Sequence, residues 1–460
     1  MPRFGRHHDA GSITEGVIWK QLLAFFFPIL LGSFFQQLYN TADAVIVGKF
    51  VGKEALAAVG GSTGTLINLL VGFFVGLSSG ATVIISQFFG ARDEKKVSDT
   101  VHTAIALSVA GGLVLTAAGL LLSDTLLRLM GTPEEVMAYA TAYLKIYFVG
   151  MVPSLIYNIG SGILRAVCDS RRPLLFLIVA AMTNIVLDVV FVLGFEMGTA
   201  GAALATILSQ AVSAVLVILT LCRSGHAYRL HIRRIRFHGR LLKDIVKIGL
   251  PAGLQSVMYS LSNVIIQTSV NGFGTDTIAA WTAYGKLDGL FWMTVSAFGV
   301  AITTFSGQNF GARKYERMRQ SVKVCLGMAF GATLCLSGIL LLLGEHLYRL
   351  FATDEAVIAL GMDILHMLVP CYTLYLCIEI LSGAVRGTGD ALIPTLITLC
   401  GVCLLRVVWL LGVAPQLGTL WAVLASYPIT WVITSALFVI YYLRGSWLRR
   451  AMKRAGHESA

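Results

Sequence analysis

The chain has 460 residues, of which 56% are hydrophobic and 13% are charged, and its mean hydropathy is +0.78. Soluble domains carry roughly 25% charged residues, so this composition excludes an ordinary soluble globular protein. The net charge of +11 does not indicate nucleic-acid binding, because Lys and Arg gather in every second loop between long apolar stretches. That asymmetry is the positive-inside pattern of membrane proteins.

Apolar stretches long enough for a membrane-spanning helix, about 20 residues, occur twelve times along the chain. They lie near 17–47, 55–85, 96–122, 135–160, 174–194, 198–222, 244–270, 277–306, 319–344, 356–384, 392–413 and 419–443. We therefore predict an all-α membrane protein with twelve transmembrane helices. The placement of the basic loops predicts that both termini are cytoplasmic and that the chain resides in the cell (inner or plasma) membrane.

The first stretch carries a polar stripe. Gln36, Asn40 and Asp43 are spaced i, i+4, i+7 and so share one face of a helix. An ionisable residue inside a span is costly and indicates a functional site; the alternative is that Asp43 lies near the outer end of the helix and is solvated. Upstream, Pro28 predicts a kink that is either a hinge or static curvature.

The fifth stretch carries a second carboxylate. Asp188 lies among valines and leucines, with Asn184 one turn earlier on the same face. Two carboxylates in a low-dielectric cavity repel each other, which favours uptake of a proton by the pair. With the amide oxygen of Asn184 they also offer oxygen ligands to Na⁺. We predict a cation-coupling site for H⁺ or Na⁺ at Asp43, Asn184 and Asp188, with Asn40 as a further member.

A basic polar segment at 223–243 divides the chain into residues 1–222 and residues 244–460, each with six predicted spans. The segment is either a solvated tether or a surface for anionic lipid. Its histidines have no acidic or Cys companions at ligand spacing, so we expect no metal there. The tail after Arg444 is short and basic and is expected to fray.

The second half repeats the first. The segment QFFGAR at 87–92 returns as QNFGAR at 308–313, at an offset of 221, and Pro28 returns as Pro251. Because each repeat has six spans, both halves enter the membrane the same way up. The sequence therefore predicts two six-helix bundles related by a parallel repeat, an architecture of secondary transporters.

The two acidic residues are not repeated, since Ile266 and Trp409 occupy the corresponding positions. This favours a cation function confined to the first half. In the second half Glu379 is either a ligand for a cationic substrate or the ion-pair partner of a buried base, Lys286 or Arg406. Candidates for a substrate cavity are Gln36, Gln37, Tyr157, Asn158, Tyr259, Met293 and Glu379.

No nucleotide-binding or catalytic motif is present. The Gly-Lys pairs at 48–49, 52–53 and 285–286 lack the following Ser or Thr of a P-loop, so a transporter would have to use an ion gradient. An intramembrane enzyme would need convergent nucleophile and base groups, whereas His102 and His366 have no obvious partners. We expect no catalytic residues and no cofactor other than the coupling ion.

These residues resemble the multidrug and toxic compound extrusion (MATE) transporters. The resemblance rests on Gln37-x-x-Asn40-x-x-Asp43, on the paired Gln-x-x-Gly-Ala-Arg elements, and on Asn184-x-x-x-Asp188. It covers essentially the whole chain. It implies export of organic cations and drugs in exchange for H⁺ or Na⁺ by alternating access, by a protein that works as a monomer.

By this resemblance Asp43, Asn184 and Asp188 match the cation site of the N-terminal lobe, and Thr206 matches a further contributor. One branch carries an acid on span seven, where this chain places Tyr259, so the resemblance is to the bacterial and archaeal branch that uses the N-terminal lobe. A flippase for a lipid-linked precursor is the alternative: Lys286 and Arg406 could hold phosphate, while the acidic pair counts against it.

Overall fold

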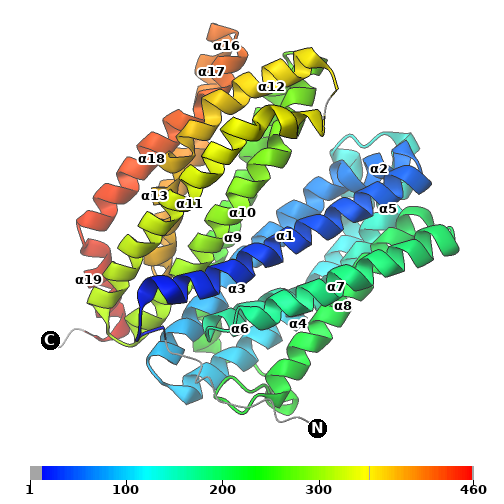
Figure 1. Cartoon of the computed structure of the whole chain (residues 1–460). Helices are drawn as coiled ribbons and strands as arrows, with labels where there is room; N and C mark the ends of the chain where they lie inside the picture. Colours follow the sequence, from blue (N-terminus) through cyan, green and yellow to red (C-terminus); the bar gives the residue numbers. More distant parts are fainter. Residues whose placement is uncertain (1–12, 352, 458–460) are drawn as a thin grey trace. The chain divides into compact units, whose positions relative to one another are not determined.

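The computed structural model describes residues 13–351 and 353–457, and all regular structure in those residues is helical (Figure 1). The described chain forms two compact units that are not continuous in sequence. The first unit contains residues 27–253, and the second contains residues 13–26 together with residues from 254 onward. The first and ninth helices therefore each begin in one unit and end in the other.

The helices of the first unit follow the predicted spans closely. They are α1 (Ile18–Phe50, from residue 27), α2 (Lys53–Gly60), α3 (Ser62–Gly90), α4 (Glu94–Leu129), α5 (Glu134–Val149), α6 (Met151–Ala166), α7 (Arg171–Asp188), the π-helix η1 (Val189–Gly194), α8 (Gly198–Arg223), the 3₁₀ turn η2 (Ile232–Arg234) and α9 (Gly239–Asn271, to residue 253).

The second unit contains the rest of α1 and α9 and the helices that follow. These are α10 (Thr275–Gly311), α11 (Tyr315–Arg349), α12 (Glu355–Leu368), η3 (Val369–Cys371), α13 (Tyr372–Gly387), α14 (Leu392–Thr398), η4 (Leu399–Leu404), α15 (Leu405–Val408), η5 (Trp409–Val413), α16 (Ala414–Leu417), α17 (Leu420–Leu424), α18 (Ser426–Leu443) and α19 (Ser446–Ala455).

Ten helical segments of the described chain are long and apolar enough to cross a membrane, and the pair α5 and α6, bent by 52°, makes an eleventh. The 33-residue α9 completes the set of twelve. Its polar side chains, such as Gln255, Asn263 and Gln267, lower its hydropathy. The prediction of an all-α membrane protein with twelve spanning helices is confirmed. The apolar pattern did not indicate the bends within spans.

The bend between α5 and α6 has a local cause. Gly150 lies at the break, and a Cβ there would overlap the side chain of Ile207 on α8. Pro153, in the first turn of α6, lacks an N–H group, so it starts the helix without losing a hydrogen bond. A small residue followed by a proline thus turns the chain and brings it against α8.

Inside the first unit, α3 crosses the first part of α9 at very close range. Gly76 and Gly80 on α3 meet Gly249 and Gly253 on α9, two Gly-x-x-x-Gly motifs in contact. A Cβ on Gly80 would lie 2.8 Å from the backbone nitrogen of Gly249, and one on Gly253 would lie 2.6 Å from the carbonyl oxygen of Phe73. Only glycine allows backbones to approach this closely in a membrane.

In the second unit the start of α1 packs against α10 through aromatic rings instead. Phe26 stacks on Phe298 at 4.1 Å between centroids, and Phe25 meets Phe305 edge-on. The segment before α1 is held by Arg317 of α11, which donates to the carbonyl oxygen of Ile13 at 3.1 Å. The first part of α9 thus packs on α3 through glycines, whereas the first part of α1 packs on α10 through aromatic rings.

The linker and the C-terminal tail are both docked. The backbone N–H of His231 donates to His102 Nε2 at 3.0 Å, and Thr103 Oγ1 lies 2.9 Å from His238 Nδ1. The expectation that His102 has no partner is therefore wrong. The expectation of a frayed tail is also wrong, because the tail forms α19, which buries Trp447. The signal for α19 was its amphipathic spacing of Trp447, Leu448 and Ala451.

The turns that end α6 and α13 show the duplication in the backbone. Cys168 has φ 68° and Gly389, at the offset of 221, has φ 89°. Both are left-handed positions just beyond a helix C-terminus, where glycine carries no steric cost. Only the second repeat has glycine there, so the first repeat holds a side chain in an unfavourable conformation.

We expect Cys168→Gly to stabilise the protein. A left-handed backbone conformation costs an L-residue roughly 1–2 kcal/mol, and glycine avoids this cost. Glycine also loses more backbone entropy on folding, so we expect the unfolding free energy to rise by a net amount of about 0.5–1 kcal/mol. The measurement is the unfolding free energy in detergent by SDS titration. Gly389→Ala is the matched control and should lose a similar amount; a loss of stability in Cys168→Gly would contradict this account.

Candidate ion-coupling pair and aromatic cavities

The predicted acidic residues come together in the interior of the first unit. Asp43 comes from α1, and Asn184 and Asp188 come from the last turns of α7. The side chains of Asn184 and Asp188 are 0% exposed and that of Asp43 is 6% exposed. The alternative that Asp43 is merely solvated at a helix end is therefore wrong. The carboxyl groups of Asp43 and Asp188 are neighbours, close enough to interact with each other.

These buried polar groups have few partners. Among the described residues, Asp43 Oδ1, both carboxylate oxygens of Asp188 and both amide atoms of Asn184 make no hydrogen bond. Buried polar atoms in folded proteins are almost always paired, and an orphaned group needs an explanation. The two carboxylates can accept a proton, and the oxygen atoms of all three side chains can ligate a hard cation, so the residues suit either coupling ion.

Local helix geometry directs Asp188 inward. The π-helix η1 begins at the next residue, Val189. A π turn inserts an extra residue into a helix and often occurs at functional sites. The corresponding part of the second repeat is also a π-helix, η5, but it begins at Trp409, the residue that replaces Asp188. The distortion is thus common to both repeats, whereas the carboxylate is not.

The other two predicted members of the cation site stand apart from the pair. Thr206 on α8 is 5% exposed, and its hydroxyl group donates to the carbonyl oxygen of Ala202 at 3.0 Å. The side chain of Asn40 is exposed on α1. Among the described residues neither forms a hydrogen bond with the acidic pair, and their roles in cation coupling stay predictions.

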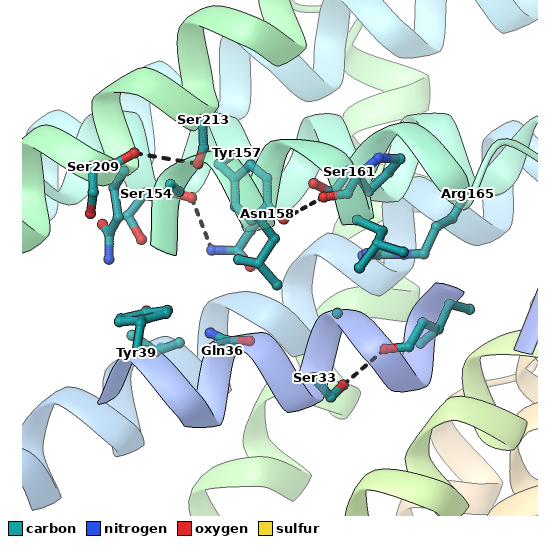
Figure 2. A pocket seen from close by; sticks show the side chains of 18 of the residues that line it. Ser33, Gln36, Tyr39, Ser154, Tyr157, Asn158, Ser161, Arg165, Ser209 and Ser213 are labelled. Atoms are coloured by element: carbon teal, nitrogen blue, oxygen red, sulfur yellow. Dashed lines mark hydrogen bonds between the residues drawn. The ribbon is translucent and has the colours of Figure 1, made fainter. Parts of the chain in front are cut away.

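A cavity of about 160 Å³ lies in the first unit among α1, α6, α7 and α8. Figure 2 shows Gln36 on α1 opposite Asn158 on α6, with the hydroxyl groups of Ser209 and Ser213 nearby. Of the predicted substrate-cavity residues, Gln36, Tyr157 and Asn158 line it and Gln37 does not. Pro28 lines one end.

Tyrosines that the sequence analysis missed connect this cavity with the acidic pair. Tyr39 and Tyr147 line the cavity, and Tyr39 is near both Tyr147 and Asp43. Tyr143, one turn from Tyr147 and stacked with it, is near Asp43 and Asp188. The available signal was helical spacing: Tyr39 lies four residues before Asp43, on the same face of α1.

A larger cavity, of about 500 Å³, lies inside the second unit. Tyr259 and Glu379 line it as predicted, whereas Met293 does not. Nearly half of its lining residues are aromatic, and these are Tyr259, Trp281, Tyr284, Trp292, Tyr375, Tyr427 and Trp431. Of these seven residues, Tyr259 is the one that the sequence analysis gives as a substrate-cavity candidate, because aromatic residues at helical spacing are usually core.

Three charged residues line this second cavity. Asp288 on α10 accepts hydrogen bonds from Trp292 Nε1 and Tyr372 Oη, each at 2.7 Å. Glu379 on α13 accepts one bond, from Tyr375 Oη at 3.5 Å, and lies against the backbone of α10 at Gly299. The third residue is Arg406 on α15.

The structure does not pair Glu379 with a buried base. Of the ion pairs found among the described residues, none joins Glu379 to Lys286 or to Arg406. The reading of Glu379 as the ion-pair partner of either base is therefore wrong within these residues. Lys286 is exposed and is not part of the cavity lining.

The geometry defines a class of protein: a duplicated helical membrane protein with a buried acidic pair in one repeat and a cavity in each. The sequence model of the MatE family matches residues 28–190 and 251–410. The chain therefore belongs to the MATE family of multidrug efflux transporters.

Relatives that match almost the whole chain support this family membership. The Bacillus subtilis proteins YpnP and YoeA, each named a probable multidrug resistance protein, are 30% and 27% identical to it, over 96% and 95% of this chain and 98% and 96% of their own. The Staphylococcus aureus multidrug export protein MepA is 23% identical over 93% of this chain and 94% of its own. These relatives are transporters rather than enzymes, and they do not favour the flippase alternative.

Solved structures confirm the fold. A MOP superfamily transporter from Pyrococcus furiosus superposes with a TM-score of 0.89 at 24% identity, covering 97% of this chain and 100% of that chain. A multidrug resistance MATE family transporter in an outward-facing conformation gives 0.87 at 23% identity, with the same coverage. The prediction of twelve helices in two six-helix bundles is confirmed.

Proposed function

We propose that this protein is a secondary active antiporter that exchanges H⁺ or Na⁺ for organic cations or drugs by alternating access. The observation that carries the proposal is the pair of neighbouring buried carboxyl groups of Asp43 and Asp188, in which Oδ1 of Asp43 and both oxygens of Asp188 have no hydrogen-bond donor among the described residues. A buried unpaired acid is costly in a membrane protein and marks an ion pathway. The same pair has no counterpart in the second repeat.

Coupling requires the ion and the drug to favour different conformations. Pro28 is a candidate hinge because α1 passes from the second unit to the first at residues 26 and 27, next to this proline. A proline removes one helical hydrogen bond and loosens the helix locally. Binding of a cation at Asp43, further along the same helix, would then change the direction of α1 at Pro28.

The two cavities supply surfaces for drugs. Gln36, Tyr157 and Asn158 offer polar groups in the first cavity, and Tyr259 and Glu379 offer an aromatic face and a carboxylate in the second. Cavities that combine aromatic side chains with a few polar groups suit small organic ligands. We also propose cytoplasmic termini, function as a monomer in the cell membrane, and no cofactor beyond the coupling ion.

The test is transport in proteoliposomes. Efflux of a fluorescent organic cation is followed under an imposed pH gradient and, separately, an imposed Na⁺ gradient. We expect one gradient to drive efflux and Asp188→Asn to abolish that drive. Asp124→Asn is the control, because Asp124 is an exposed carboxylate paired with Lys145 at 2.7 Å. Efflux that neither gradient drives would overturn the antiporter proposal.

A further inference from the structure

The second cavity contains a buried cation without an anionic partner. Arg406 lines this cavity and is only 2% exposed. Its one hydrogen bond among the described residues goes from Nη2 to Thr430 Oγ1 at 3.2 Å, and its Nε makes none. The guanidinium group also lies over the ring of Tyr427, at 4.3 Å from the centroid. A hydroxyl group and a ring face leave most of its N–H donors without a hydrogen bond and its charge without a carboxylate partner among the described residues.

The acids of the cavity do not supply the missing partner. Asp288 is already held by the indole of Trp292 and the hydroxyl groups of Tyr284 and Tyr372, all neutral donors. Glu379 receives one long hydrogen bond and, among the residues described, forms no ion pair. The cavity thus holds one basic and two acidic side chains, and among the described residues none of the three forms an ion pair with another.

Buried charges are costly unless they are paired, and an arginine fork is suited to a carboxylate. A ligand with both a carboxylate and an ammonium group would satisfy Arg406 and Glu379 together. The aromatic rings around them would hold a planar hydrophobic group. A purely cationic ligand would leave Arg406 unpaired and would add a like charge to its cavity.

We propose that the second cavity is a binding site for aromatic zwitterions, with Arg406 contacting the carboxylate of the ligand and Glu379 its ammonium group. This differs from an organic-cation site, because the positive side chain is part of the recognition. The site lies wholly within the second unit, apart from Asp43 and Asp188. Binding there can be measured without any gradient, so the inference stands or fails independently of the antiporter proposal.

The test uses three dansyl probes that share one fluorophore and a similar chain. Nε-dansyl-lysine ends in an ammonium and a carboxylate, dansylcadaverine ends in the ammonium alone, and dansyl-6-aminohexanoate ends in the carboxylate alone. Equilibrium binding to the purified full chain in detergent is read from dansyl emission excited through tryptophan, since Trp281, Trp292 and Trp431 line the cavity. We expect the zwitterion to bind about tenfold or more tightly than either singly charged probe.

Arg406→Gln should bring the affinity for Nε-dansyl-lysine down to that for dansylcadaverine, while the affinity for dansylcadaverine itself is unchanged or higher. A merely structural loss would weaken all three probes together. Two controls are Lys286→Gln, a positive charge on α10 outside the lining, and Arg165→Gln, the arginine of the first cavity. Both should keep the preference for the zwitterion.

The probe series on the unmodified protein keeps the test decisive even if Arg406→Gln does not fold. Equal binding of the zwitterion and the cation by the unmodified protein would overturn the proposal. So would a preference that is lost in Arg165→Gln and kept in Arg406→Gln, because the carboxylate would then be recognised in the first cavity. Binding of none of the three probes would overturn it as well.

Discussion

Replacing Asp43 by Asn is expected to abolish gradient-driven efflux while the protein stays folded. Asparagine has nearly the shape of the carboxyl group, but it can neither take up a proton nor offer a negative charge to Na⁺. A coupling free energy of about 1–3 kcal/mol means that binding of one ligand changes the affinity for the other about 5- to 150-fold, and the substitution removes this coupling. The measurement is the initial rate of efflux from proteoliposomes under the gradient that drives the unmodified protein.

The same substitution should not lower the stability of the protein. Asp43 is 6% exposed and its Oδ1 makes no hydrogen bond among the described residues, so little native bonding is lost. Removing one of two neighbouring buried carboxylates also relieves repulsion. We therefore expect an unfolding temperature equal to or above that of the unmodified protein. A folded Asp43→Asn variant that retains full driven efflux would refute the assignment.

The double variant Asp43→Asn with Asp188→Asn tests whether the two carboxylates act as one pair or as two independent sites. Groups that act as a unit show strongly non-additive losses, because the first substitution already removes the function. We expect the double variant to transport no worse than either single variant.

The sequence could identify both residues because each is a lone acid in an apolar helix, with an uncharged counterpart in the repeat.

The sequence could not show which residues line the cavities. Gln36 and Gln37 are adjacent in sequence and equally polar, yet only Gln36 lines the first cavity. Likewise Trp292 lines the second cavity and its neighbour Met293 does not. A helix turns by about 100° per residue, so a choice between neighbours requires the rotation of the helix, which packing against other helices sets.

The π-helices limited the sequence analysis for a related reason. Arg406 lies in the four-residue helix α15 between η4 and η5. Periodicity arguments assume 3.6 residues per turn, and each π turn shifts the faces that follow it. The pairing of Arg406 with Glu379 was plausible from composition alone. The geometry instead gives each residue a separate neighbour, Tyr427 for Arg406 and Tyr375 for Glu379.

Gly80→Ala is expected to be among the most destabilising single-methyl changes in the first unit. The added Cβ would overlap the carbonyl oxygen of Ile245 and lie 2.8 Å from the backbone nitrogen of Gly249. Backbone atoms cannot rotate away as side chains can, so α3 and α9 must separate. Overpacking of this kind costs about 1–3 kcal/mol, and more where neighbours cannot yield. The measurement is the unfolding free energy by SDS titration in mixed micelles.

Gly331→Ala is the matched control. Gly331 lies in the middle of α11, where an added Cβ meets no atom within 4 Å. Because alanine is a better helix former than glycine by about 1 kcal/mol, this variant should be neutral or more stable. A similar loss in both variants would show that helix propensity or the assay, and not the close crossing, determines the result.

Combining Gly80→Ala with Gly249→Ala tests the crossing as one contact. A Cβ on Gly249 would overlap the backbone at Leu77, one helical turn from Gly80 on α3. Once the first methyl group has separated the helices, the second finds space already made, so the double variant should lose less than the sum of the single losses. Additive losses would mean that each methyl group is accommodated locally. The two helices would then not depend on the Gly-x-x-x-Gly contact for their approach.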